Sequence, residues 1–202
     1  MKKLLSIILV SVMLFAATAV TSFAATTHTV EKGDSLWKIA VRYQVGLAEI
    51  KEANPAIKNY NLIYPGQKIT IPTVDSAATA FEGEVVRLVN NIRAENGLKP
   101  LTQDWQLSRV ARYKSQDMKD LGYFSHTSPT YGSPFTMMKS FGISYRTAGE
   151  NIAKGYASPE AVVNAWMNSK GHRANILNSS YTHIGVGYVA SGNYWTQMFV
   201  GR

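Results

Sequence analysis

The C-terminal stretch 183–202 constrains the fold most, because its apolar and polar residues alternate in two runs separated by a turn. The letters HIGVGYV and YWTQMFV flank ASGN, and this arrangement predicts a β-hairpin. The chain from residue 81 up to that hairpin carries helical periodicity instead. Helices followed by paired strands predict an α+β domain in which helices pack in layers against a sheet.

Three stretches before the hairpin have the spacing of amphipathic helices. The first, FEGEVVRLVNNIRAENGL, begins at residue 81. The second, LTQDWQLSRVARYKSQDMKDLG, begins at Thr102 or Asp104, either of which can cap its first turn. The third, SPEAVVNAWMNSKG, has Pro159 at its first helical position and Gly171 after its predicted end.

Residues 28–72 form a separate unit with a pattern of its own. His28 to Glu31 alternate like a short strand, and the letters KITI after the turn PG predict a second strand. Between them, LWKIAVRY and GLAEIKEA predict two short helices, the first capped by Asp34 or Ser35. The order strand, helix, helix, strand defines a small βααβ module.

This module resembles the LysM domain in the phrases HTVEKGDSLWKIAVRY, IKEANP and NLIYPGQKITIP. LysM domains bind N-acetylglucosamine-containing glycans, peptidoglycan or chitin, in a shallow groove between two loops. Backbone groups of such loops can hold the acetamido group, while apolar side chains receive its methyl. Trp37 has the form of a stacking platform, but its spacing from Ala40 and Val41 predicts a core position. The resemblance implies that the glycan-binding residues are Gly33, Asp34, Ser35, Leu36, Asn61, Leu62, Ile63, Tyr64, Pro65 and Gly66.

The remainder of the chain is a short joint followed by a larger domain. Residues 73–80, TVDSAATA, are small and polar and are expected to form a linker. Residues 81–202 resemble the CAP superfamily (cysteine-rich secretory proteins, antigen 5 and pathogenesis-related 1, or SCP-like domains) in LVNNIRAENGLKPL, YFSHTSP, AGENIAKG, AWMNSKGHRANILN and HIGVGYV. The resemblance implies an α-β-α sandwich with a central cleft. In many members that cleft gathers two histidines and two glutamates, and in some it binds a divalent cation.

Three members of this tetrad match the sequence: His126 in FSHTS, Glu150 in GEN and His172 in GHR. The fourth, a glutamate in relatives, falls on Ser169. Acid–base cleavage of a glycosidic bond normally needs two carboxylates with separated pKa values. A glycosidase is therefore disfavoured, and we expect a ligand-binding cleft without established catalysis.

The chemistry of these three side chains leaves other functions open. Two imidazoles and one carboxylate are a sufficient donor set for a catalytic zinc with one open position for water. In that case the chain would be a metal-dependent hydrolase acting on wall or peptide substrates. A competing interpretation needs no cofactor, since the histidines and Glu150 would brace loops by hydrogen bonds. Binding of a lipid or sterol, as in some family members, is a third alternative.

The first 24 residues have the pattern of a secretory signal peptide. Lys2 and Lys3 precede an apolar run, and the small residues Ser22 and Ala24 precede the predicted cleavage point. No integral membrane segment is expected once this segment is removed. The chain contains no cysteine, so an exported domain must be stabilised by core packing alone.

The charge of the chain bears on its partners. The formal net charge is +8, and basic and acidic residues are interspersed. This distribution favours attraction to a polyanionic surface such as a cell wall, and the lack of a basic stripe argues against nucleic acid. We predict a bacterial protein that is extracellular or associated with the wall or a spore layer. Its LysM domain would bind peptidoglycan or another N-acetylglucosamine-containing glycan and so tether the CAP domain.

Overall fold

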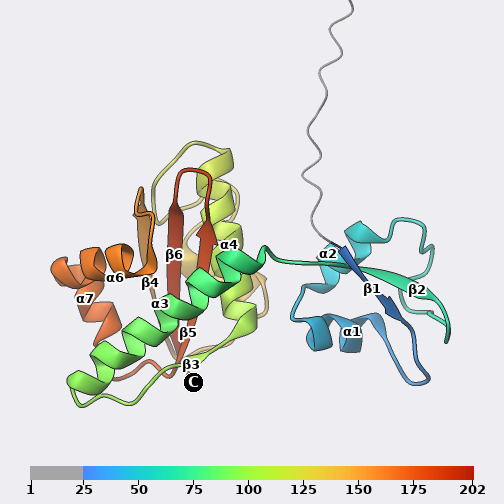
Figure 1. Cartoon of the computed structure of the whole chain (residues 1–202), viewed down its shortest axis with the longest axis horizontal. Helices are drawn as coiled ribbons and strands as arrows, with labels where there is room; N and C mark the ends of the chain where they lie inside the picture. The colour runs from blue at the N-terminus through green and yellow to red at the C-terminus, as the bar shows by residue number, and fades with distance from the viewer. Residues whose placement is uncertain (1–24) are drawn as a thin grey trace, which may run out of the picture.

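The computed structural model describes residues 25–202, which form a small N-terminal domain and a larger C-terminal one (Figure 1). The predicted signal peptide, residues 1–24, lies outside the described residues. From residue 25 onward, no helix is both long enough and apolar enough to cross a membrane.

The small domain has the βααβ order that the sequence predicts. The two strands pair antiparallel, with Ala25 opposite Pro72 and Thr29 opposite Lys68, so the first strand begins at Ala25 and not at His28. Of the two predicted caps, Ser35 is the one that caps the first helix, because its hydroxyl accepts the Lys38 N–H at 3.2 Å. The elements are β1 (Ala25–Thr29), α1 (Leu36–Tyr43), α2 (Leu47–Ala53) and β2 (Lys68–Pro72).

The core of this domain is a single apolar cluster. Leu36, Ile39 and Ala40 of α1 are buried because they follow the helical period. Ile69 and Ile71 of β2 alternate with polar residues and pack on the same cluster. No cysteine contributes, so this packing carries the stability of the domain.

The large domain is built on a four-stranded sheet. Strand order is β3-β5-β6-β4, in which β5 and β6 form the predicted hairpin and β3 runs parallel to β5. The elements are α3 (Ser76–Glu95), β3 (Thr102–Gln103), α4 (Trp105–Asp120), α5 (Pro134–Ser140), β4 (Thr147–Lys154), α6 (Pro159–Asn168), α7 (Lys170–Ile176), β5 (His183–Val189) and β6 (Tyr194–Gly201).

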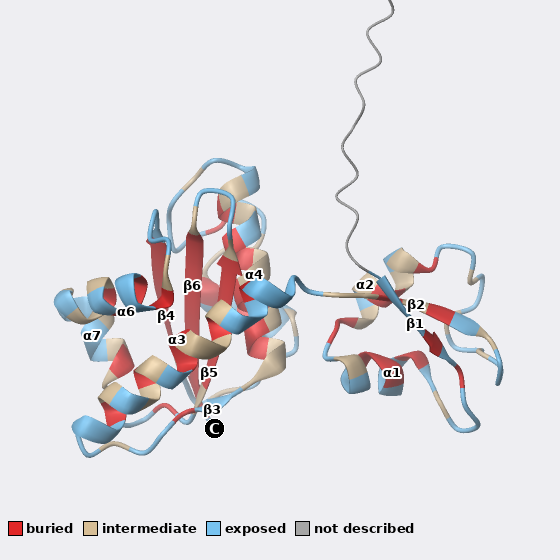
Figure 2. Ribbon diagram, in the orientation of Figure 1, coloured by how far each residue is buried: buried red, intermediate tan, exposed pale blue. Residues whose placement is uncertain are grey.

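Helices cover both faces of this sheet, so the α-β-α sandwich implied by the sequence is confirmed. Ile184 and Val186 pack in one cluster with residues of α3 and α6. Met198 and Val200 of β6 face the opposite side of the sheet and pack in another cluster with residues of α4 and α5. Figure 2 shows the strands buried along most of their length, whereas the helices are exposed on their outer sides.

Three differences from the sequence predictions concern α3, β4 and the end of α6. Residues 76–80, expected in the linker, form the first turns of α3, which Asp75 caps by accepting the Ala77 N–H at 2.8 Å. The letters SAATA are compatible with this because alanine has the highest helix propensity. AGENIAKG forms strand β4, which no alternation indicated. Gly171 lies within α7 and does not terminate the preceding helix, which ends at Asn168.

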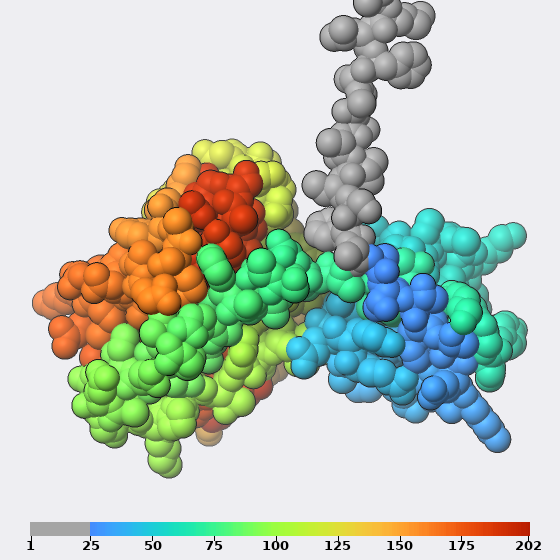
Figure 3. All heavy atoms as spheres, in the orientation of Figure 1, coloured from blue at the N-terminus to red at the C-terminus, as the bar shows by residue number. Residues whose placement is uncertain are grey.

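The two domains form lobes of unequal size in Figure 3, and an ion pair joins them. The guanidinium of Arg109 in α4 donates to both carboxylate oxygens of Glu49 in α2, with Nη2 at 2.8 Å from Oε2. The same guanidinium lies over the rings of Tyr113 and Phe141, at 5.4 and 5.2 Å from their centroids. A two-pronged Arg–carboxylate contact supported by aromatic rings has a defined geometry, so it fixes where the domains meet.

Candidate functional site

A shallow hollow of about 230 Å³ lies in the small domain, between the start of α1 and the loop before β2. We call it the LysM hollow. Its position matches the groove that the LysM resemblance implies. Its lining residues are Asp34, Ser35, Leu36, Trp37, Leu47, Lys51, Tyr60, Asn61, Leu62 and Ile63.

Six of the ten predicted glycan-binding residues line this hollow, and four do not. Gly33 and Gly66 shape the two loops instead, with positive φ angles of 90° and 88° that favour glycine. Tyr64 and Pro65 lie in the second loop beyond the lining, and the Tyr64 side chain is exposed.

The core position predicted for Trp37 is wrong. Its side chain is 63% exposed and lies at the rim of the LysM hollow. Leu36, Ile39 and Ala40 face the core, so Trp37 falls on the outer side of α1. A large exposed indole beside a hollow indicates a binding surface more strongly than a single exposed aliphatic residue does. Leu47, Lys51 and Tyr60 line the hollow too, and the sequence did not single them out.

In the large domain, the structure brings His126 and Glu150 together. The Nδ1 atom of His126 is 2.8 Å from Oε1 of Glu150. The imidazole is half exposed, whereas the carboxylate is 1% exposed. Burial raises the pKa of the Glu150 carboxyl, while the His126 hydrogen bond and the charge of Lys114 oppose that rise. The hydrogen bond therefore joins a buried carboxylate to a solvent-exposed imidazole.

Lys114 is a member of this site that the sequence did not reveal. Its side chain is fully buried in α4, and its ammonium donates to the backbone carbonyl of His126 at 2.8 Å and to the Tyr123 hydroxyl at 3.3 Å. Burial lowers the pKa of Lys114, and the negative charge of Glu150 opposes this shift. A lysine in a polar helix segment is normally exposed, so only tertiary packing shows that Lys114 is buried.

His172 lies in α7, next to the edge strand β4. Its backbone carbonyl accepts the side-chain amide of Asn151, and Asn175 of the same helix donates to the backbone carbonyl of Glu150 at 3.2 Å. Burial lowers the pKa of the His172 imidazole, and the charge of His126 lowers it further. The three predicted cleft residues therefore belong to one region of the fold.

Two protein-family profiles match parts of the chain. The profile of the cysteine-rich secretory protein family, CAP, matches residues 86–201, and the LysM domain profile matches residues 28–72. The chain belongs to the CAP family. It carries an N-terminal LysM domain in addition.

Two relatives of this CAP protein come from Bacillus. It is 65% identical over 133 residues to the uncharacterized protein YkwD of Bacillus subtilis (strain 168), a match that covers 66% of this chain and 52% of the relative. It is also similar to the crystal structure of an extracellular SCP-domain protein from Bacillus anthracis str. Ames, with 34% identity, a TM-score of 0.60, and coverage of 68% of this chain and 47% of that one. The chain thus spans about half the length of these relatives.

A third relative is a bacterial amidase. An N-acetylmuramoyl-L-alanine amidase, sle1 of Staphylococcus epidermidis, is 34% identical over 88 residues, or 44% of this chain and 26% of the relative. The LysM and CAP domains, together with relatives of this kind, support a cell-wall-associated CAP protein.

The residues of the CAP site bear on the divalent cation that the sequence leaves open. Across residues 25–202, no group of three or more histidine, aspartate or glutamate side chains is arranged to hold a metal ion. His126 and Glu150 pair with each other, and Ser169 stands where the CAP resemblance implies a glutamate. The Oε2 atom of Glu150 is buried without a hydrogen-bond partner among the described residues, and the charge of the buried Lys114 ammonium acts on the same carboxyl. A divalent cation held by His126, Glu150 and His172 stays a prediction.

Proposed function

We propose that this protein binds N-acetylglucosamine-containing glycan, such as peptidoglycan, through the LysM hollow, and that this binding tethers the CAP domain to the cell wall. The observation that carries the proposal is the exposed indole of Trp37 at the rim of the hollow. An aromatic plane offers a rigid apolar surface to the C–H face of a pyranose ring.

The rest of the hollow suits a neutral sugar. Leu36, Leu62 and Ile63 supply apolar surface for an acetamido methyl. Ser35 and Asn61 supply hydroxyl and amide groups for hydrogen bonds. A mostly apolar concavity with a few polar groups is the usual composition of a specific small-ligand site. Lys51 is the only basic side chain in the lining. Its ammonium lies over the Tyr60 ring, 5.3 Å from the centroid, so a cation–π contact within the protein already engages it.

The positive net charge of the protein favours a location at the cell wall. The sequence has a formal net charge of +8, and loss of Lys2 and Lys3 with a leader would lower it by two. A wall rich in anionic polymers attracts a protein of this sign over distances of about a Debye length, roughly 10 Å at moderate salt. Charge would raise the local concentration, and the LysM hollow would provide the specificity.

For the CAP domain, we propose a ligand site at the His126–Glu150 pair, with no catalytic step assigned. The exposed imidazole of His126 can donate or accept a hydrogen bond to an incoming polar group. Glu150 and Lys114 beneath it are buried and fix the ring and its loop. A wall-tethered domain would then present this site to molecules at the bacterial surface.

The indole of Trp37 provides the test of glycan binding. We expect Trp37→Ala to weaken binding of tetra-N-acetylglucosamine by at least about tenfold, or ~1.4 kcal/mol, in titration calorimetry. The melting temperature should stay nearly the same, because an exposed side chain contributes little to folding. Phe135→Ala, which removes a 46% exposed aromatic residue from the CAP domain, is the matched control and should bind like the wild type. Equal affinity of Trp37→Ala and wild type would refute the proposed site.

A further inference from the structure

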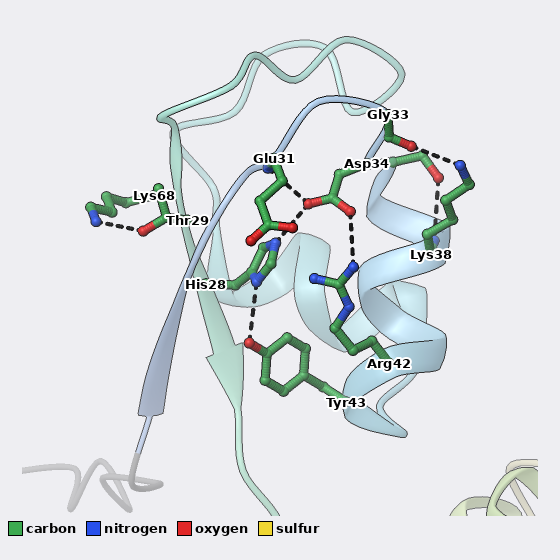
Figure 4. Close-up of polar contacts among 10 residues, drawn as sticks. His28, Thr29, Glu31, Gly33, Asp34, Lys38, Arg42, Tyr43 and Lys68 are labelled. Carbon is green, nitrogen blue, oxygen red and sulfur yellow. Dashed lines mark hydrogen bonds and ion pairs between the residues drawn. The ribbon is translucent and has the colours of Figure 1, made fainter.

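Asp34 lies in the loop that lines the LysM hollow, yet its carboxylate is turned into the domain. Its side chain is only 5% exposed. Oδ2 accepts the backbone N–H of Glu31 at 2.9 Å and lies 2.8 Å from Nε2 of His28. Oδ1 accepts from Arg42 at 3.3 Å. Figure 4 shows these contacts converging on one carboxylate, which is therefore engaged by the protein and not free for a sugar hydroxyl.

His28 extends this set of contacts into the core. Its ring, 6% exposed, lies between Asp34 and Tyr43, with Nδ1 at 3.2 Å from the Tyr43 hydroxyl and the two rings edge to face at 5.6 Å (Figure 4). A neutral imidazole with its proton on Nε2 donates to Asp34 and accepts the Tyr43 hydroxyl proton, so both ring nitrogens are satisfied. The contacts join β1, the loop after it and the end of α1.

One backbone hydrogen bond closes the loop itself, from the Asp34 N–H to the Glu31 carbonyl at 3.1 Å. Glu31, Lys32 and Gly33 are exposed, and Gly33 has a left-handed φ of 90°. The Lys38 ammonium donates to the Gly33 carbonyl at 2.7 Å, but this contact is exposed. The Glu31 N–H, the hydrogen bond from His28 and the charge of Arg42 hold the pKa of Asp34 below its usual value, which agrees with an ionised carboxylate that accepts several donors. The buried His28–Asp34 contact is therefore the firmest polar anchor of the loop.

We propose that His28 and Asp34 are positioning residues for glycan binding: they hold the loop 31–36 in the shape that presents Ser35 and Leu36 to the sugar. This inference rests on the proposed glycan binding of the LysM hollow. A loop that is ordered before the ligand arrives loses less conformational freedom on binding. Asp34 thus acts from behind the binding surface, and not as the direct glycan contact that its sequence position suggests.

Four variants of the chain from residue 25 separate the contacts. His28→Phe keeps a ring but removes both nitrogens, and Tyr43→Phe removes only the hydroxyl. Asp34→Ala removes the acceptor for Glu31 and His28. Asp34→Asn keeps one acceptor oxygen, and because both donors meet at Oδ2, this oxygen can still serve them. Asp34→Asn is therefore the rescuing variant.

The readouts are affinity for tetra-N-acetylglucosamine and amide hydrogen exchange, both at a temperature where each variant is folded. We expect His28→Phe and Asp34→Ala to bind about fivefold to tenfold more weakly, with Asp34→Asn within about twofold of wild type. Tyr43→Phe should fall between them. Exchange at the Glu31 N–H should accelerate in His28→Phe, while exchange at the N–H of the buried Ile50, which donates to the Gly46 carbonyl at the start of α2, stays unchanged.

The possible outcomes separate this proposal from the one it rests on. Wild-type binding together with unchanged affinity of His28→Phe and Asp34→Ala would overturn the positioning role alone. Equal acceleration of exchange at Glu31 and Ile50 would also overturn it, since the residues would then act only on global stability. A wild-type chain that does not bind the tetrasaccharide at all would refute the glycan proposal, and the positioning role with it.

Discussion

Replacing Glu82 by alanine should lower the free energy of unfolding of the CAP domain by about 3 kcal/mol or more. Glu82 lies in α3, and its side chain is completely buried. The Nε and Nη2 groups of Arg112, in α4, both donate to its carboxylate, and so does the backbone N–H of Tyr188, in β5, at 3.0 Å. Its loss would leave a largely buried cation and a buried N–H without partners, and both are costly.

Chemical denaturation with two further variants provides the comparison. Glu84→Ala removes an exposed ion pair with Arg87 on the same helix and should change stability far less than Glu82→Ala does. Glu82→Gln keeps an acceptor for the Tyr188 N–H and should be less damaging than alanine. If Glu82→Ala and Glu84→Ala destabilised equally, the buried contact would not be the bridge between α3, α4 and β5 that its geometry indicates.

Glu82 also predicts a pH dependence. Burial raises the pKa of its carboxyl above the ordinary value of 4.5, despite the opposing effect of Arg112. Between the two pKa values the unfolded chain binds fewer protons than the folded one, so this group lowers stability as pH rises through that interval. Glu82→Gln should remove this contribution, which denaturation curves between pH 4 and 7 would reveal.

Replacing Gly187 by alanine should destabilise the CAP domain by about 3 kcal/mol, because α4 packs directly on this glycine. A Cβ atom there would overlap the backbone nitrogen of Arg112 and the carbonyl carbon of Ala111. These are backbone atoms of a helix, so no side-chain rotation can relieve the overlap. The helix would have to move away from the sheet and lose its close packing.

Gly83 offers the matched control for this experiment. It lies inside α3, and a Cβ atom there would have no neighbour within 4 Å. Gly83→Ala should therefore stabilise the domain by about 0.5–1 kcal/mol through helix propensity. Thermal denaturation that gives the same sign of change for Gly83→Ala and Gly187→Ala would contradict this account of the α4–β5 contact.

The parts of the fold that the sequence predicts are those with strong periodicity. The hairpin of β5 and β6 and the βααβ module follow from alternation and from turn residues. Strand β4 was missed because residues 149–153 are buried in succession on both faces, and a short run without alternation carries no strand period. Burial on both faces is a property of the assembled layers.

The parts of the candidate site that the sequence does not predict depend on which way a side chain points. The spacing of Trp37 from Ala40 permits a core position, but Leu36 and Ile39 already fill the inner side of α1. Asp34 sits in a glycan-binding phrase, yet its carboxylate contacts His28, six residues earlier in sequence. Lys114 is buried through contacts to a loop twelve residues away. Each outcome depends on tertiary packing, which local propensity does not encode.

The central claim, that the LysM domain tethers this CAP protein to the wall, is tested most directly by co-sedimentation with purified peptidoglycan. The chain from residue 25 should sediment with the insoluble glycan, and a chain without residues 25–75 should remain in the supernatant. Circular dichroism of the shortened chain would establish that its CAP domain is folded. Equal retention of the folded, shortened chain would contradict the claim.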